Sequence, residues 1–527
     1  MFSLVVHSCR SRLGQYAGSL IVVVMASALF TALATIVDRV QLAGLGHGPE
    51  RSAESLMGLV GGTSGLAALL LVGNTLSLVV QQRRREIGVL RTIGASPAQI
   101  RAEIVAETLV IALVGGVAGA VGGGVAAGPA LRWLIAHQVF PPGPEAGFSP
   151  QGFAIGVLGV VAVAVLAALA AVYRPTRTPP LTGLREAEIE RRVMPIGRAV
   201  AAVLTLALAG AVWQRYETKP GAGEAVNGAM ALCLFLLVSA WLLAPLLVRP
   251  LVVPGALPGR LLSRYTGQLA AVTSAHAVRR VAAMSGPVLI AVGLGAALLC
   301  SGSASEAVIR SRTTAEASAT AVPPGTPVAA LSRTTASHPA LSPAGLPPTA
   351  LPLTEVARTG PWSTGVSAEA AAAASAGPGA DGAGVGAMRE QQRRNEVGTR
   401  VLMAPLLVFS AVGILNTLLL ATRQRRGEFA VLRLTGATGA QILRMLFWES
   451  VVVVVGGVVT AGAVLGVYLS VLARRLAPYG VDLASLVPAG SLLQVIVCCA
   501  ALGLLGVLVP GALALRVRAV QATRGRD

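Results

Sequence analysis

Charged and aromatic residues are rare in this sequence, and their rarity excludes an ordinary soluble fold. Only 12% of its 527 residues are Asp, Glu, Lys or Arg and only 4% are Phe, Trp or Tyr, whereas 54% are hydrophobic. The mean hydropathy is +0.72. Because soluble domains carry about 25% charged residues, this composition indicates a protein that crosses a membrane many times.

Cysteine and histidine are also scarce, and their positions argue against a metal centre or a disulfide framework. The chain has five of each, scattered without the close spacing of metal ligands. We therefore expect no metal and no catalytic residue in this chain.

Long hydrophobic runs dominate the sequence instead. A helix needs about 20 apolar residues to cross about 30 Å of hydrocarbon, and ten segments meet this requirement. They are residues 17–37, 58–80, 104–127, 152–173, 197–213, 228–247, 283–301, 402–421, 446–471 and 491–516. Polar residues are rare inside them, whereas the strands of a β-barrel alternate at every second residue. We therefore predict an all-α polytopic membrane protein with ten transmembrane helices.

The arginines predict the orientation of these spans. They cluster in loops that follow even-numbered spans, for example at residues 83–101, 174–198 and 423–444. The positive-inside rule then places both termini in the cytoplasm. The exceptions are Arg132, Arg474 and Arg475 at outer helix ends, where long side chains reach lipid headgroups. The net charge of +19 thus indicates a lipid membrane as partner and no nucleic acid.

Lysine is nearly absent, since Lys219 is the only one, while arginine, alanine and glycine are abundant. This usage suggests a bacterial genome of high GC content. We expect a multi-pass protein of the bacterial cell membrane.

One unit occurs twice in the sequence. A shift of 342 positions aligns residues 83–108 with 425–450, and 12 of these 26 positions are identical. Because six spans precede the second copy, we expect two parallel four-helix repeats around an axis along the membrane normal. The predicted units are residues 1–186 and 261–527, separated by a linker pair of transmembrane helices at 187–260.

The second unit carries an insert between spans seven and eight. Residues 302–398 are rich in Pro, Ala, Ser and Thr and contain few large apolar side chains. Such a composition buries little core, so we expect a small or partly disordered extracytoplasmic domain rather than an enzyme domain. Residues 303–317 are predicted to be either a solvated surface or a stalk that extends span seven.

The two copies are most alike in "REIGVLRTIGAS", residues 85–96, and "GEFAVLRLTGAT", residues 427–438. One interpretation is a loop that anchors topology, for which basic residues alone suffice. The two copies also share a Glu, a Gly-Ala pair and a following Gln at the same offsets. These shared residues favour a binding surface for a partner. The candidate binding residues are Glu86, Val89, Leu90, Arg91, Gly94, Ala95, Glu428, Val431, Leu432, Arg433, Gly436 and Ala437.

Both stretches carry the signals of a helix that ends and a new helix that begins. Gly94 suits a left-handed residue after a helix, Ser96 suits an N-cap and Pro97 the first helical position. Gly436 and Thr438 hold the corresponding places in the second copy. We predict a short helix along the membrane surface, then a break, then a new helix.

Two further features are repeated in both halves. Glu107 and Glu449 lie near inner span ends, where a carboxylate is costly unless it is paired or hydrated. We expect them to contact Arg91 and Arg433 or a neighbouring helix, the alternative being a proton or substrate site. Glycines four residues apart, which permit close helix packing, predict a packing face in each half. They are Gly115, Gly119 and Gly123 in the first half and Gly462 and Gly466 in the second.

The repeated "E-(I/F)-(G/A)-V-L-R-x-x-G-A-(S/T)" after a span, followed by "AQI", resembles the FtsX-like permease family of ABC transporters. The resemblance covers nearly the whole chain. Ten spans with an outside domain between spans seven and eight are similar to the bacitracin-export type, although the insert here is smaller.

The resemblance implies that the two repeated loops are coupling helices for cytoplasmic ABC ATPase subunits, two copies per permease. No G-x-x-x-x-G-K-[ST] loop occurs in the chain, so this subunit has no ATPase site or cofactor of its own. ATP and Mg²⁺ are then expected on the partner. The implied function is export of an amphipathic, lipid-like or peptide substrate. The alternatives are an ion-gradient-driven secondary transporter and a transmembrane sensor or scaffold.

Overall fold

The structure is a computed structural model, and its described part is helical throughout. It describes residues 13–43, 61–62, 65–66, 89–90, 92–137, 147–172, 196–218, 221–262, 266–276, 278–320, 407–408, 410–416, 418 and 425–515. Within these ranges the only regular elements are helices, which confirms the predicted all-α class.

Eight helices in the described part are long and apolar enough to cross a membrane. They coincide with predicted spans one, three to seven, nine and ten. Most of predicted span two, residues 58–80, and half of predicted span eight, residues 402–421, lie outside the described residues. The chain is therefore a multi-pass membrane protein.

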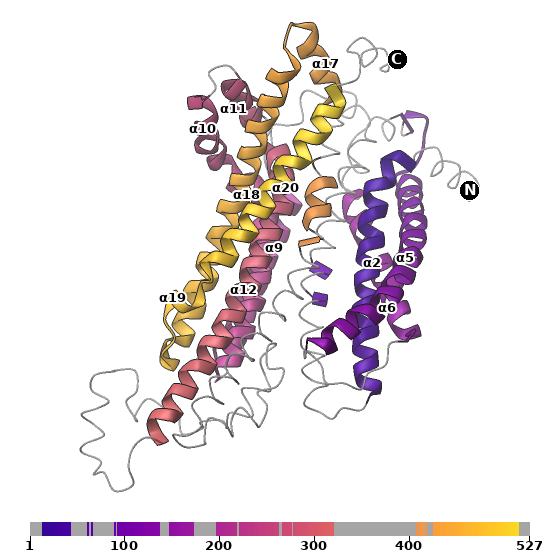
Figure 1. Cartoon of the computed structure of the whole chain (residues 1–527). Helices are drawn as coiled ribbons and strands as arrows, with labels where there is room; N and C mark the ends of the chain where they lie inside the picture. The colour runs from indigo at the N-terminus through magenta and orange to yellow at the C-terminus, as the bar shows by residue number, and fades with distance from the viewer. Residues whose placement is uncertain are drawn as a thin grey trace.

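The first bundle consists of α2 (Leu13–Leu42), α5 (Pro97–Ala136) and α6 (Pro150–Val172), which pack against one another (Figure 1). Glycines make the α2–α5 contact possible. A Cβ atom at Gly119 would lie 2.2 Å from the carbonyl oxygen of Val24, and one at Gly123 would lie 2.1 Å from that of Ala28. The predicted packing face of the first half is confirmed.

The corresponding prediction for the second half is wrong. Gly462 and Gly466 are exposed, and a Cβ atom at either would meet no atom within 4 Å. The glycine that permits close packing there is Gly457, where a Cβ atom would lie 2.9 Å from Val288. Gly457 aligns with Gly115 at the 342-residue shift, so the spacing of Gly462 and Gly466 is a chance match.

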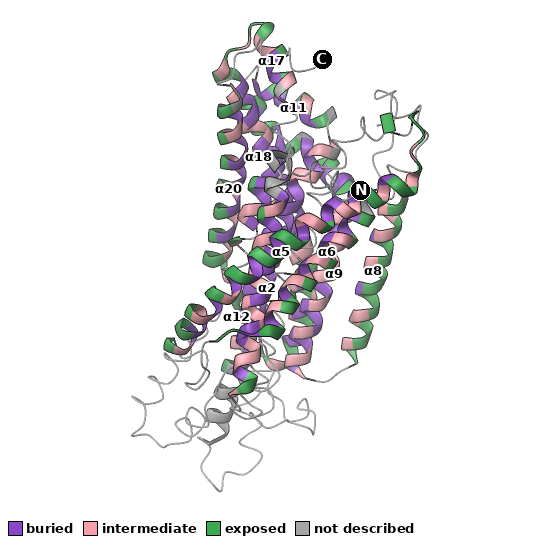
Figure 2. Ribbon diagram, turned by 90° about the vertical axis from the view of Figure 1, so that its right-hand side faces the viewer, coloured by how far each residue is buried: buried purple, intermediate pink, exposed green. Residues whose placement is uncertain are grey.

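The second bundle is built around α12 (Val278–Thr320), which α9 (Ala222–Gly255), α18 (Gly439–Leu476) and α20 (Ala489–Leu515) surround. In its most apolar stretch 89% of the residues of α12 are buried, against 11% for α8 (Ile196–Glu217). Figure 2 shows α8 along one edge of the molecule, with mostly exposed residues. Its apolar side chains, such as Val203 and Leu204, are suited to contact with lipid.

Two arginines attach α8 to its neighbours. Arg198 donates from Nη2 to the carbonyl oxygen of Trp241 at 2.6 Å and from Nε to that of Leu242 at 2.7 Å. At the other end, Arg475 of α18 donates to the last carbonyl oxygens of α8, those of Tyr216 and Glu217. Arg475 therefore caps a helix within the protein, which corrects its predicted role of reaching headgroups.

The two halves also contact each other through the predicted spans two and eight. Leu66 packs against the core of the second bundle, and Val412 packs against the core of the first. Because Leu66 belongs to the first copy and Val412 to the second, each copy contributes a side chain to the surroundings of the other bundle.

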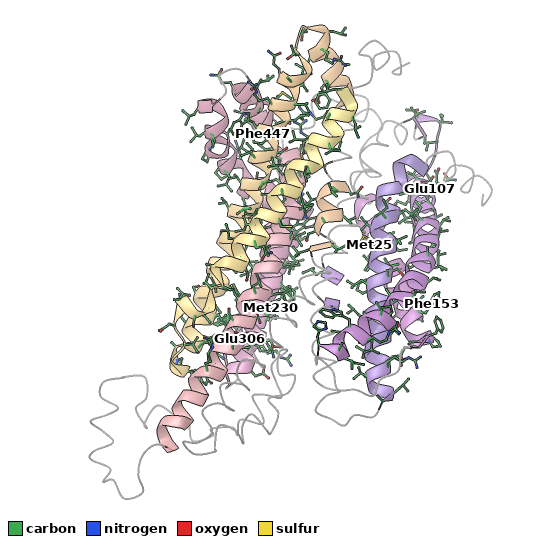
Figure 3. All side chains as sticks on the ribbon, in the orientation of Figure 1. Met25, Glu107, Phe153, Met230, Glu306 and Phe447 are labelled. Carbon is green, nitrogen blue, oxygen red and sulfur yellow. The ribbon has the colours of Figure 1, made fainter. Side chains whose placement is uncertain are left out.

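Helix direction follows from the labelled side chains in Figure 3. Glu107 of α5 and Phe447 of α18 lie towards one end of the molecule, whereas Phe153 of α6, Met230 of α9 and Glu306 of α12 lie towards the other. Helices α5 and α18 thus run in the same direction, as parallel repeats require. We call the end at which they begin the break end.

Helix α12 continues well beyond the predicted end of span seven at residue 301. It runs to Thr320, so residues 303–317 are helical, as the stalk interpretation predicts. Most of the insert, residues 321–398, lies outside the described residues.

Candidate functional site

The repeated loop of the second copy is a short helix, a break and a long helix, as predicted. Helix α17 (Arg426–Leu434) has Thr435 as its C-cap, and Gly436 follows with a φ of 98°. The N–H of Ala437 donates to the carbonyl oxygen of Leu432 at 2.9 Å, and the N–H of Gly436 donates to that of Arg433 at 3.2 Å. These two bonds form a Schellman motif, which needs a left-handed residue at the position of Gly436.

The next helix, α18, starts with a capping box. Thr438 Oγ1 accepts from the N–H of Gln441 at 3.3 Å, and the N–H of Thr438 donates to Gln441 Oε1 at 2.9 Å. These bonds satisfy two of the polar groups left open at a helix start.

The first copy has the same geometry at the start of α5. Gly94 has a φ of 102°, and the N–H of Ala95 donates to the carbonyl oxygen of Leu90 at 2.9 Å. Ser96 and Gln99 form the capping box, with Pro97 as the first helical residue. The predicted left-handed turn, N-cap and first helical position are confirmed, whereas most of the short helix before them lies outside the described residues. We call residues 89–99 and 425–441 the first and second break segments.

This geometry gives several in-phase residues a local role. Gly-Ala forms the Schellman motif, Ser or Thr with Gln forms the capping box, and Leu432 and Ala437 pack against the core of the second bundle. Their repetition is explained by the shape of the break, without contact to a partner. Their predicted ATPase contacts stay predictions.

Apolar side chains remain exposed on both break segments. Val89 and Val431, which occupy equivalent positions, are 47% and 52% exposed. Ile93 in the first segment and Leu434 in the second are also exposed. Glu86 and Arg91 lie outside the described residues. The two valines are the clearest exposed feature that the two segments share.

An ion-pair network that the sequence analysis did not predict lies beneath α17. Arg425 donates from Nη1 to Glu449 and from Nε to Glu428 at 2.7 Å. Thr273 of α11 (Thr266–His276) donates to Glu449 at 2.7 Å, and Arg280 of α12 lies 3.8 Å from Glu449. The side chain of Arg425 is 5% exposed and that of Glu449 is 12% exposed. Burial lowers the pKa of Arg425, but both carboxylates outweigh this effect and leave the pKa above its ordinary value.

The network alters the predicted pairing of Glu449. Its arginine partners are Arg425 and Arg280, whereas Arg433 donates to the carbonyl oxygen of Leu515 at 3.0 Å. The predicted contact with a neighbouring helix is confirmed by Thr273 and Arg280. Arg425 is identical to Arg83 in the aligned copies, and this identity three residues before the repeated Glu428 was a signal for the Arg425–Glu428 pair, but not for the pairing of Glu449.

Glu107 is the counterpart of Glu449 in the first copy. It is 2% exposed, so the carboxylate is buried in α5 near the break end. Arg91, its predicted partner, lies outside the described residues.

Two copies of one helical unit, each with the same capped break at the same end, define a duplicated multi-pass membrane protein. The family model FtsX-like permease C-terminal matches residues 58–180 and 400–519. The matches begin 342 residues apart, the same shift that aligns the break segments. A comparison with curated proteins gives no match.

The chain thus contains the FtsX-like permease C-terminal domain twice, which supports membership of an FtsX-like permease family. Members of this family are membrane subunits of ABC transporters. They have no ATPase site of their own and associate with ABC ATPase subunits.

Proposed function

We propose that this chain is the permease of an ABC exporter that binds two ATPase subunits, one at each break segment. The ATPases hold ATP and Mg²⁺ and move the break segments, and the two bundles move against each other. The substrate is an amphipathic, lipid-like or peptide molecule extruded from the membrane. Both termini and the break end are cytoplasmic, since the arginine-rich loops belong to that side.

The observation that carries this proposal is the repeated break with an exposed valine in each copy. Val89 and Val431 precede identical left-handed turns, and the helices that follow run in the same direction. A second exposed apolar side chain, Ile93 or Leu434, lies one helical turn from each valine, and apolar side chains that gather on an exposed surface favour burial against a protein. Two equivalent sites at one end suit two copies of one partner.

The alternatives predict different features. A secondary transporter needs ionisable residues near the middle of the membrane, but the described ion pairs of this chain lie at the break end and at Glu306–Arg310 in the outer part of α12. A sensor or scaffold would bind its partner in a nucleotide-dependent way without substrate movement.

The proposal is tested with Val89→Asp, Val431→Asp and the double variant. The partner for this test is an ABC ATPase with a Walker A motif, to be sought first in the genes adjacent to that of this chain. We expect each single variant to retain about half the bound ATPase and the double variant to retain none, with loss of stimulated ATP turnover in all three. The matched control is Leu483→Asp, because Leu483 is 53% exposed and begins α19 (Leu483–Leu486) at the other end (Figure 1). Wild-type stoichiometry in the double variant would refute docking at the break segments.

A further inference from the structure

Four helices meet at the carboxylate of Glu449. It belongs to α18, it accepts from Thr273 of α11, and it pairs with Arg280 of α12 and with Arg425 at the start of α17. Helices α11 and α12 lie beside the start of α18 at the break end (Figure 1). Residues 266–280 also fall outside both regions matched by the family model.

Helix α17 depends on such contacts for its position. It has nine residues, fewer than an isolated helix needs to be stable in water. Phe429 packs into the core below it and Arg433 binds the end of α20. At the first turn of α17, the buried ion pair between Arg425 and Glu449 links this helix to α18.

The residues of this network differ in how strongly their removal should destabilise the contact between α17 and α18. The side chains of Arg425 and Glu449 are nearly buried, so removing Glu449 takes away the buried partner of Arg425 and leaves its charge paired with the exposed Glu428. Glu428 is 55% exposed, and an exposed ion pair contributes little. Glu449 is thus the acidic group on which the network depends.

We propose that Glu449 is a positioning residue for α17, which it holds at a fixed place against α11 and α12. The exposed side chains of Val431 and Leu434 on α17 then have a fixed orientation relative to the bundle. Contact between this exposed surface and an ATPase rests on the proposed function. The positioning of α17 by Glu449 does not.

The positioning is measured on the full-length chain alone, in lipid nanodiscs, with spin labels at Val431→Cys and Val272→Cys. Both sites are exposed, one on α17 and one on α11. Cys9 and Cys498 are replaced by Ser, and the buried Cys233, Cys300 and Cys499 are retained. We expect a narrow distance distribution in the parent chain and a shifted, broader one in Glu449→Gln. The matched control, Glu306→Gln, removes the carboxylate of the outer pair with Arg310 and should leave the distribution unchanged.

The double variant Glu449→Gln with Arg425→Met separates positioning from stability. It also removes the buried charge of Arg425, which Glu449→Gln leaves with the exposed Glu428 as its partner, and apolar replacements of buried pairs are often as stable as the pair. We expect its thermal stability to return towards that of the parent chain while the broad distance distribution remains. A narrow distribution in either Glu449→Gln or the double variant would overturn the proposal.

ATPase binding gives a second measurement. We expect at least about tenfold weaker binding for Glu449→Gln and for the double variant, and a change within about fivefold for Glu428→Gln. Recovery of binding together with stability in the double variant would show that Glu449 is only structural. If the parent chain bound no ATPase at all, the proposed function would fail, while the distance measurement would still decide the positioning role.

Discussion

The guanidinium of Arg198 donates to the carbonyl oxygen of Trp241, the carbonyl that Pro245 leaves without its helical donor. Proline has no N–H, so position 241 of α9 loses its bond from four residues ahead. Arg198 supplies the missing donor at 2.6 Å, and its guanidinium carbon lies 5.3 Å from the centre of the Trp241 ring. The side chain of Arg198 therefore supplies the hydrogen bond that Pro245 cannot donate, and it also links α8 to α9.

We expect Arg198→Met to loosen α8 from α9. Each hydrogen bond from a charged group contributes about 1.5–3 kcal/mol, and this change removes two of them. The midpoint of thermal denaturation should fall, and limited proteolysis should become faster between residues 187 and 221. Arg132→Met, at an exposed position of α5, is the control and should behave like the parent chain. Equal midpoints for the two variants would contradict the bracing role.

The left-handed turns predict a strong preference for glycine at two positions. Gly436→Ala places a Cβ atom at a φ of 98° and should destabilise the second break by about 1–2 kcal/mol. Gly436→Asn should lose less, because Asn tolerates this conformation better. Gly462→Ala, at an exposed position within the following helix α18, should be as stable as the parent or slightly more stable. Chemical denaturation would rank the three variants, and an unaffected Gly436→Ala would show that the break rearranges.

The close contact of α2 and α5 predicts opposite results for neighbouring glycines. Gly119→Ala forces a Cβ atom against the backbone oxygen of Val24, which lies 2.2 Å away, and overpacking of this kind costs about 1–3 kcal/mol. Gly122→Ala meets no atom within 4 Å and should be neutral. Thermal denaturation of the two variants side by side distinguishes a packing face from a merely glycine-rich run.

The predicted orientation is tested by labelling of single cysteines in intact cells. With Cys9 and Cys498 replaced by Ser, Ser342→Cys in the insert should react with a membrane-impermeant maleimide, and Ala522→Cys near the C-terminus should react only after permeabilisation. The positive-inside rule gives this expectation. The reverse pattern would place the break end outside the cell and remove the basis for ATPase docking.

The break segments were predictable because their chemistry is local. The turn at Gly94 and the cap at Ser96 depend on residues within a few positions, and sequence spacing specifies such bonds directly. The pairing of Glu449 was not predictable in the same way. Arg425 is 24 positions away in the chain and Thr273 is 176 positions away, so only the packing of α11, α12 and α18 brings them together.

Composition predicted the spans but not the elements between them. Two short helices, α10 (Leu257–Leu262) and α11, follow α9 at the break end. Their hydrophobic pattern is too short to distinguish them from a loop. The misassigned glycines at positions 462 and 466 have a related cause, since a period of four on a helix does not reveal which face meets another helix.

The cap that Arg475 places on α8 has a consequence for biogenesis. Arg475 follows Glu217 by 258 positions in the chain, and ribosomes add about 5–20 residues per second. Helix α8 therefore enters the bilayer roughly 13 to 50 s before its cap is synthesised. During that interval α9 is its partner from the linker, and Arg198 already fastens the other end. A nascent chain stalled before α18 would therefore carry α8 tethered at one end only.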